Sequence, residues 1–113
     1  MIIHKMLKKV YIASPYTIGN KERNVLRQID VADKLMDLGF APFWPLRSHY
    51  HHIEHARPYE DWMQLDFTWV LSCNAVLRLD GESEGADHEV EIAIYYGLPV
   101  FYGLEELKEN FSA

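Results

Sequence analysis

The apolar positions of this chain form short runs that predict buried β-strands. Each run is rich in β-branched or aromatic side chains and stops at proline, glycine or a polar residue. The runs occupy residues 10–13, 41–45, 74–79 and 99–102. Pro42 and Pro45 indicate that the second run forms an edge strand, or that they lie at its ends, because proline has no N–H to give to a neighbouring strand.

Between these runs, apolar side chains recur at the three- or four-residue spacing of amphipathic helices. The predicted helices cover residues 21–38, 59–71, 84–96 and 104–111. Asn20 can cap the first helix, and Gly39 follows its last apolar residue, where a helix-ending glycine belongs. The buried face of the first helix is predicted to carry Val25, Ile29, Ala32 and Met36, with Leu26 and Leu35 beside them.

Residues 46–58 show no clear period, and we expect a long connection there. Connections of this length in a small domain are often functional. Four of the six histidines lie in it, at His49, His51, His52 and His55. Their spacing matches no zinc motif and no cysteine is near, so no metal is predicted. We expect instead a mobile loop whose histidines contact the substrate.

The alternation of strands and helices predicts the fold class. Such a chain forms a parallel sheet with helices on its faces, here a three-layer flavodoxin- or Rossmann-like α/β domain with four to five strands. A chain of 113 residues makes one domain, residues 1–113. Ligands of these folds bind beyond the carboxyl ends of the strands, which places a site near Ser14, the loop after Pro45, and residues 80–85.

Composition and charge exclude several classes of partner. The formal net charge of −6 argues against DNA or RNA polymers, which demand clustered lysine and arginine. No apolar run approaches the roughly 18 residues of a membrane span, and the first residues are too broken by charge for a signal peptide. The single cysteine, Cys73, excludes an internal disulfide and suits the cytoplasm. We therefore expect a cytoplasmic protein that acts on a small molecule.

One carboxylate of the third predicted helix lies on its apolar side. Ala86 and Ala93 fall within about 60° of Glu89 around the helix axis, whereas Asp87 and Glu91 lie on the opposite side. Burying a carboxylate costs several kcal/mol unless the group is paired or its pKa shifts. Glu89 is therefore predicted to be the centre of an active site.

The helix at residues 59–71 repeats this anomaly. Trp69 lies within about 60° of Asp66, whereas Asp61 points away. The alternative explanation is a structural role for either acid, which would cap a strand end or form an ion pair with Arg47 or Arg78, since such pairs also involve buried acids. Two inward acids on successive helices favour a functional site, and we expect their side chains to approach the same crevice.

Two further sets of residues are candidate ligand contacts. Tyr16, Trp44 and Tyr50 could stack on a nucleobase, although aromatic side chains of a small domain often belong to the core. Ser83 and Gly85 could bind a phosphate through backbone amides at a helix start. The alternative for Ser83 is an ordinary N-cap.

Three stretches resemble motifs of the nucleoside 2-deoxyribosyltransferase-like superfamily, which includes the 2′-deoxynucleoside 5′-monophosphate N-hydrolases. The stretches follow one another along the chain in the same order as in that superfamily. Residues 83–93, Ser-Glu-Gly-Ala-Asp-His-Glu-Val-Glu-Ile-Ala, look like its Gly-x-x-x-Glu-x-x-x-Ala signature. Residues 10–16, Val-Tyr-Ile-Ala-Ser-Pro-Tyr, are similar to its first strand and substrate loop. Residues 63–69 followed by residues 73–76 resemble its helix with an active-site aspartate and the next strand.

The resemblance implies cleavage or transfer at the N-glycosidic bond of a nucleoside or nucleoside 5′-monophosphate, without a cofactor. It implies that Glu89 is the nucleophile at C1′ and that Asp66 orients the substrate or manages the proton of the leaving base. It places around the sugar or phosphate Ser14, Pro15, Tyr16, Ser83 and Gly85.

Three matters stay open at this level. Either water or a second base could complete the reaction, so hydrolase and transferase are both compatible with the pattern. The resemblance also implies a homo-oligomer, a dimer or larger. The alternative function is a non-catalytic nucleotide-binding or sensing domain, because one fold hosts many functions.

Overall fold

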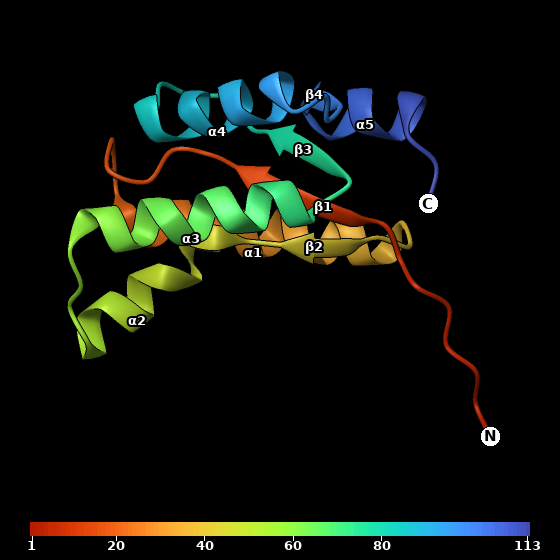
Figure 1. Ribbon diagram of the computed structural model, residues 1–113, viewed down its shortest axis with the longest axis horizontal. Coiled ribbons are helices and arrows are strands. Elements are labelled where there is room, and N and C mark those ends of the chain that lie inside the picture. Colours follow the sequence, from red (N-terminus) through yellow and green to blue (C-terminus); the bar gives the residue numbers. More distant parts are fainter.

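A four-stranded parallel sheet in the order β2-β1-β3-β4 forms the middle layer of the protein (Figure 1). The computed structural model describes residues 1–113. Its strands are β1 (Lys9–Ala13), β2 (Ala41–Phe43), β3 (Ala75–Arg78) and β4 (Val100–Tyr102). β1 and β3 are the central pair, with Val10 opposite Ala75 and Ala13 opposite Arg78. All pairings are parallel, which confirms the predicted fold class.

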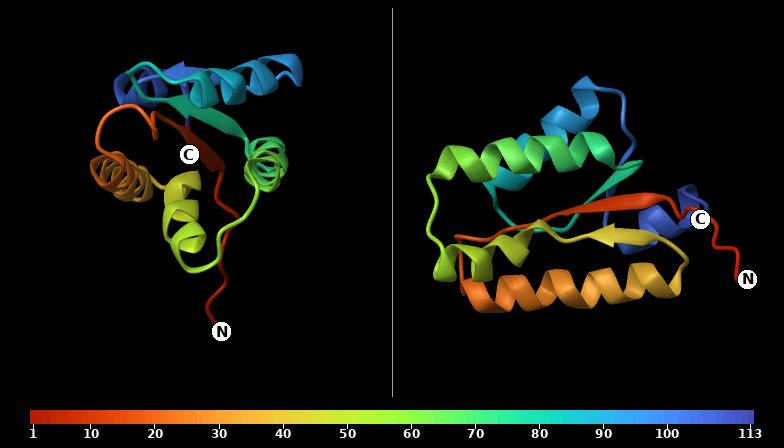
Figure 2. Two further views of the ribbon diagram at one scale, coloured as in Figure 1. Left: turned by 90° about the vertical axis from the view of Figure 1, so that its left-hand side faces the viewer. Right: turned by 60° about the horizontal axis from the view of Figure 1, so that its bottom comes forward.

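Helices cover both faces of this sheet (Figure 2). Those near their predicted positions are α1 (Lys21–Asp37), α3 (Tyr59–Ser72), α4 (Glu84–Tyr95) and α5 (Leu104–Asn110). α1 and α5 pack on one face and α3 and α4 on the other. None of the helices combines the length and apolar character that crossing a bilayer requires.

Strand β1 supplies side chains to both layers of core. Val10 and Ile12 belong to the cluster under α1 and α5, whereas Tyr11 and Ala13 belong to the cluster under α3 and α4. All four are fully buried. This division follows from the pleat, because successive side chains of a strand point to opposite faces.

The buried face of α1 differs in part from the prediction. Met36 is 63% exposed and Leu26 is 54% exposed, so both point to solvent. The buried positions form a stripe that includes a polar residue, namely Val25, Gln28, Ala32 and Leu35. The prediction used apolar residues alone, so the predicted buried face was centred on a different side of the helix and excluded Gln28.

Gln28 is fully buried because its amide is satisfied on both sides. Its Nε2 donates to the carbonyl of Ile12 at 3.1 Å and to Ser14 Oγ at 2.8 Å. Its Oε1 accepts a hydrogen bond from the backbone N–H of Leu46 at 3.0 Å. One side chain of α1 therefore joins the end of β1 to the segment that follows β2.

The expected long connection at residues 46–58 is instead largely helical. β2 ends at Phe43, and the 3₁₀ turn η1 (Pro45–Arg47) and helix α2 (Ser48–Glu54) follow it. Pro45 starts η1, a position where its missing N–H costs nothing. α2 contains no buried residue, so its sequence has no apolar stripe from which a helix could be predicted.

Replacing Gln28 by methionine, which has a similar size, should lower the free energy of unfolding by about 2–3 kcal/mol. The substitution removes three hydrogen bonds and leaves buried backbone and hydroxyl groups unpaired. Urea denaturation would measure the change. The control is Gln64→Met on the exposed side of α3, and equal stabilities of the two variants would contradict a bracing role for Gln28.

Candidate active site

A tyrosine of β1 contacts a glutamate of α4 inside the protein. Tyr11 is fully buried, and its Oη donates a hydrogen bond to Glu89 Oε2. Glu89 is half-buried on the inner side of α4, whereas Asp87 and Glu91 are exposed. The helical angle had indicated this orientation of Glu89. The hydrogen bond fixes one carboxylate oxygen against the central strand.

Burial raises the pKa of both inward acids. Desolvation by burial raises the pKa of Glu89 from 4.5 to about 8. The hydrogen bond from Tyr11 and the charge of Arg78 lower this pKa, and the charge of Asp66 raises it. Desolvation raises the pKa of Asp66 from 3.8 to about 7. The pKa of Tyr11 also lies well above 10, through burial and then the charges of Glu89 and Asp66. Tyr11 therefore remains a donor, and the acids hold protons near neutral pH.

Neither acid has an ion-pair partner. Arg78 pairs with Asp87 at 2.9 Å on the other side of α4. Arg47 lies over the rings of Phe43 and Trp44, 4.8 Å from each centroid. The ion pairs of the protein include neither Glu89 nor Asp66. The predicted alternative of an ion pair with Arg47 or Arg78 is therefore wrong for both acids.

An aromatic stack adjoins the acids on the β2 side. The rings of Tyr11 and Phe43 stack with centroids 5.7 Å apart, and those of Phe43 and Trp69 with centroids 4.4 Å apart. Trp69 is one turn from Asp66 on α3. Trp44, predicted to stack on a base, packs instead against the core cluster under α1 and α5, because it follows Phe43 and points to the opposite face.

Tyr16 and His49 form a second polar contact at the same edge of the sheet. Tyr16 Oη and His49 Nδ1 are hydrogen bonded at 2.6 Å, and the ring of Tyr50 packs edge-on against His49, with centroids 5.1 Å apart. Nε2 of His49 is buried and has no hydrogen-bond partner, the only side-chain atom of the chain in this state. A buried nitrogen of this kind is costly unless a ligand or water pairs with it. His49 thus joins Tyr16 and Tyr50 as a candidate ligand contact.

Ser14 and Pro15 lie at the C-terminal end of β1 and are both buried. Ser14 Oγ accepts the hydrogen bond from Gln28. Pro15 contacts the loop after β3, where a Cβ added to Gly81 would lie 2.8 Å from Pro15 Cγ. These two residues therefore shape the edge of the site by packing.

Ser83 caps α4, as the simpler interpretation predicted. Its Oγ accepts a hydrogen bond from the N–H of Ala86 at 3.1 Å. Gly85 lies in the first turn of α4 and is exposed. A cap and a phosphate contact are compatible, because the hydroxyl hydrogen of Ser83 stays free to donate.

An open cavity of about 490 Å³ lies at the C-terminal ends of β3 and β4. Its lining consists of Arg78, Leu79, Asp80, Gly81, Asp87, Tyr102, Gly103 and Leu104. It lies on the far side of α4 from the acids, because Asp87 and Glu89 point to opposite sides of that helix. The chain has no group of three histidine, cysteine, aspartate or glutamate side chains arranged to hold a metal ion.

Fold and site together define a Rossmann-like α/β domain with two protonatable, unpaired acids on one face of its sheet. The chain belongs to the family described as a domain of unknown function, DUF4406, whose model matches residues 8–102. No curated protein matches the chain. The matched residues include every strand and the three side chains Tyr11, Asp66 and Glu89, so the candidate site lies within the family domain.

The raised pKa of Asp66 should make its contribution to stability decrease as pH increases. The folded protein binds the proton more tightly than the unfolded chain, so this contribution is full below pH 3.8 and is lost as pH rises through about 7. Asp66→Asn should therefore be more stable than the natural protein at pH 8 by about 1–3 kcal/mol. At pH 5 the gain in stability should be smaller.

Urea denaturation of the two proteins at both pH values would measure this difference. The exposed Asp33 of α1 provides the matched control, Asp33→Asn. The interpretation fails if the stability gain of Asp66→Asn is the same at pH 5 and pH 8.

Proposed function

We propose that the protein cleaves or transfers at the N-glycosidic bond of a nucleoside or nucleoside 5′-monophosphate, with Glu89 as nucleophile. The observation that carries this proposal is the Glu89 carboxylate, which is hydrogen bonded by a buried tyrosine and forms no ion pair. Membership of the nucleoside 2-deoxyribosyltransferase-like superfamily is part of the proposal, supported by the order of the three motifs along the chain.

The two acids would have different roles in the reaction. The ionised form of Glu89 attacks C1′ as the bond from C1′ to the base breaks, and Asp66 donates its proton to the departing base nitrogen. The Tyr11 hydrogen bond favours the charged form of Glu89. The product of this step is a glycosyl ester of Glu89 and a free base.

The second step regenerates the enzyme. Water or an acceptor base attacks C1′ of the ester and loses a proton to the Asp66 carboxylate, while Glu89 leaves as a carboxylate. Water gives a free sugar and an acceptor base gives a new nucleoside. Adding an acceptor base to the reaction and looking for a new nucleoside distinguishes the hydrolase from the transferase.

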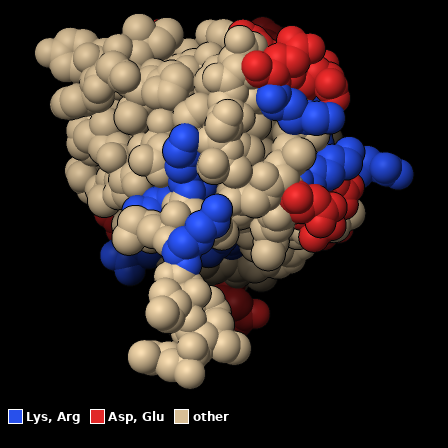
Figure 3. Space-filling view, turned by 90° about the vertical axis from the view of Figure 1, so that its right-hand side faces the viewer, with Lys and Arg blue, Asp and Glu red and all other residues tan.

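The proposal includes a small substrate rather than a polymer. Figure 3 shows the edge where the strands begin, and lysine and arginine side chains there lie among acidic and uncharged ones instead of forming a basic stripe. The net charge of −6 agrees with this distribution.

We also propose a cytoplasmic homo-oligomer. Cys73 is a free, buried thiol, as suits a reducing compartment. Large apolar side chains are exposed on α3 and at the end of α4, where a second copy could cover them. They are Leu65, Trp69, Ile94, Tyr95 and Tyr96.

A binding domain without catalysis is the second candidate function. The observation that favours it is the cavity at the ends of β3 and β4, whose lining includes neither Glu89 nor Asp66. A ligand that binds there would contact neither acid. Binding of nucleotides without any release of base would support this candidate.

Glu89→Gln should lower the rate of base release by roughly 10³-fold or more, because the amide cannot act as the nucleophile. A panel of deoxynucleosides and their 5′-monophosphates, analysed by chromatography for free base, would measure it. Glu91→Gln, on the exposed side of the same helix, should keep full activity.

Mass spectrometry of the protein with substrate should also detect a glycosyl adduct on Glu89. The proposed function is refuted if the natural protein binds members of the panel and releases base from none. It is also refuted if Glu89→Gln is as active as Glu91→Gln.

The rate constant kcat/KM should be highest between about pH 7 and pH 8. Glu89 must be ionised and Asp66 protonated. With pKa values of about 8 for Glu89 and about 7 for Asp66, this is the minor of the two singly protonated forms of the pair, and both forms are most populated between these two values. Initial rates from pH 5 to pH 10 test this expectation. A flat profile would show that the two acids do not take part in proton transfer.

A further inference from the structure

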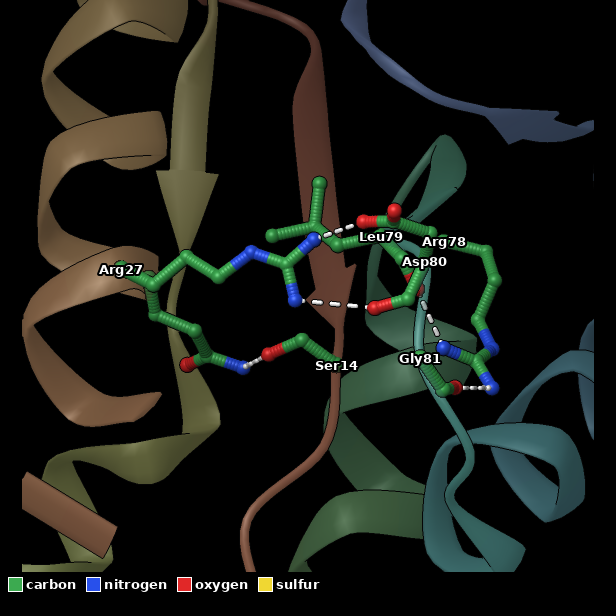
Figure 4. A network of polar contacts seen from close by, with 7 residues as sticks. Ser14, Arg27, Arg78, Leu79, Asp80 and Gly81 are labelled. Atoms are coloured by element: carbon green, nitrogen blue, oxygen red, sulfur yellow. Dashed lines mark hydrogen bonds and ion pairs between the residues drawn. The ribbon is translucent and has the colours of Figure 1, made fainter. Parts of the chain in front are cut away.

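Two consecutive residues of α1 hold the loops that follow the first three strands. Figure 4 shows the contacts with Ser14 after β1 and with Asp80 after β3. Gln28 binds Ser14 after β1 and the N–H of Leu46 after β2. Arg27 reaches the loop after β3, where its Nη1 donates to the Asp80 carbonyl at 2.8 Å and its Nη2 pairs with the Asp80 carboxylate. The helix on one face of the sheet thus contacts all three loops at the ligand-binding edge.

The loop after β3 is also held from the other side. Arg78 donates to the carbonyls of Leu79 and Gly81 and to the Asp87 carboxylate, the last two at 2.9 Å. Arg27 belongs to α1, whereas Asp87 belongs to α4 on the opposite face. The main chain of residues 79–81 is therefore clamped by Arg27 of α1 and by Arg78 at the end of β3, whose guanidinium also pairs with α4.

This loop carries the candidate phosphate contacts but is not what holds Glu89. Ser83, the N-cap of α4, is separated from the clamped residues only by Glu82, and Gly85 lies in the first turn of α4. Glu89 lies further along α4, where Tyr11 and the packing of Val90 secure it. A change in the loop should therefore alter substrate binding more than the chemical step.

We propose that Arg27 is a positioning residue of this site. Through Asp80 it holds the loop after β3, so that Ser83 and the first amides of α4 face the 5′-phosphate of a nucleoside monophosphate. The inference rests on the proposed function. Arg27 itself touches no substrate.

The exposure of the pair makes Arg27 a good residue to change. The side chain of Arg27 is 38% exposed and that of Asp80 is 98% exposed. Exposed ion pairs contribute little to folding. Arg27→Ala should leave the fold intact and release only the loop.

The first test measures the loop without any substrate. In hydrogen exchange followed by mass spectrometry, the amides of residues 79–86 should exchange about two- to fivefold faster in Arg27→Ala, the size expected for loss of an exposed pair. The matched control is Arg23→Ala, one turn earlier on α1 and without an ion pair. Equal loop exchange in the two variants would overturn the proposal.

The second test measures catalysis. Arg27→Ala should raise KM for the best 5′-monophosphate by about two- to fivefold, with kcat nearly unchanged and a smaller effect on the plain nucleoside. Arg23→Ala should match the natural protein. The exchanged pair Arg27→Asp with Asp80→Arg should recover part of the loss, which a general loss of stability would not do.

The outcomes separate the two proposals. If the loop of Arg27→Ala loosens but KM does not change, Arg27 is not a positioning residue. If the natural protein releases no base from any substrate, the proposed function fails. Hydrogen exchange still decides whether Arg27 holds the loop.

Discussion

The hydroxyl of Tyr11 needs a hydrogen-bond acceptor inside the protein, and the α3/α4 face is organised around that need. Tyr11 lies on the central strand and is fully buried, so solvent cannot satisfy it. Glu89 supplies the acceptor and so enters the apolar packing of α4. Burial then raises its pKa and that of Asp66. Because no cation pairs with these acids, their charge and protons remain available to a ligand.

The two faces of the sheet have different roles. The face under α1 and α5 is an apolar core, at whose edge Gln28 and its partner Ser14 are buried polar residues. The face under α3 and α4 holds the tyrosine, the two acids and Arg78. Arg27 and Gln28 link the faces, since they extend from the apolar side to the loops where the strands end. Two side chains of the layer with the apolar core thus hold loops at the edge of the layer that contains the two acids.

Patterns that depend on regular geometry were predicted well from the sequence. The strand and helix order followed from periodicity, and the inward orientation of Glu89 followed from helical angles. Gln28 was missed because a search for apolar stripes passes over a polar side chain whose partners lie elsewhere in the chain. α2 was missed because it buries nothing. The face of Trp44 depends on where a three-residue strand ends, which two prolines made uncertain.

Gly81 fixes the main-chain path of the loop after β3, whereas a neighbouring side chain of this loop can change. Its φ of +113° and its close approach to Pro15 leave no room for a side chain. Its neighbour Glu82 is exposed and forms no ion pair, so its side chain can vary without releasing the loop. Natural variation or directed evolution can therefore change the charge that this edge presents while the path of the main chain stays constant. A change of charge at residue 82 thus alters the surface of this edge without a new loop shape.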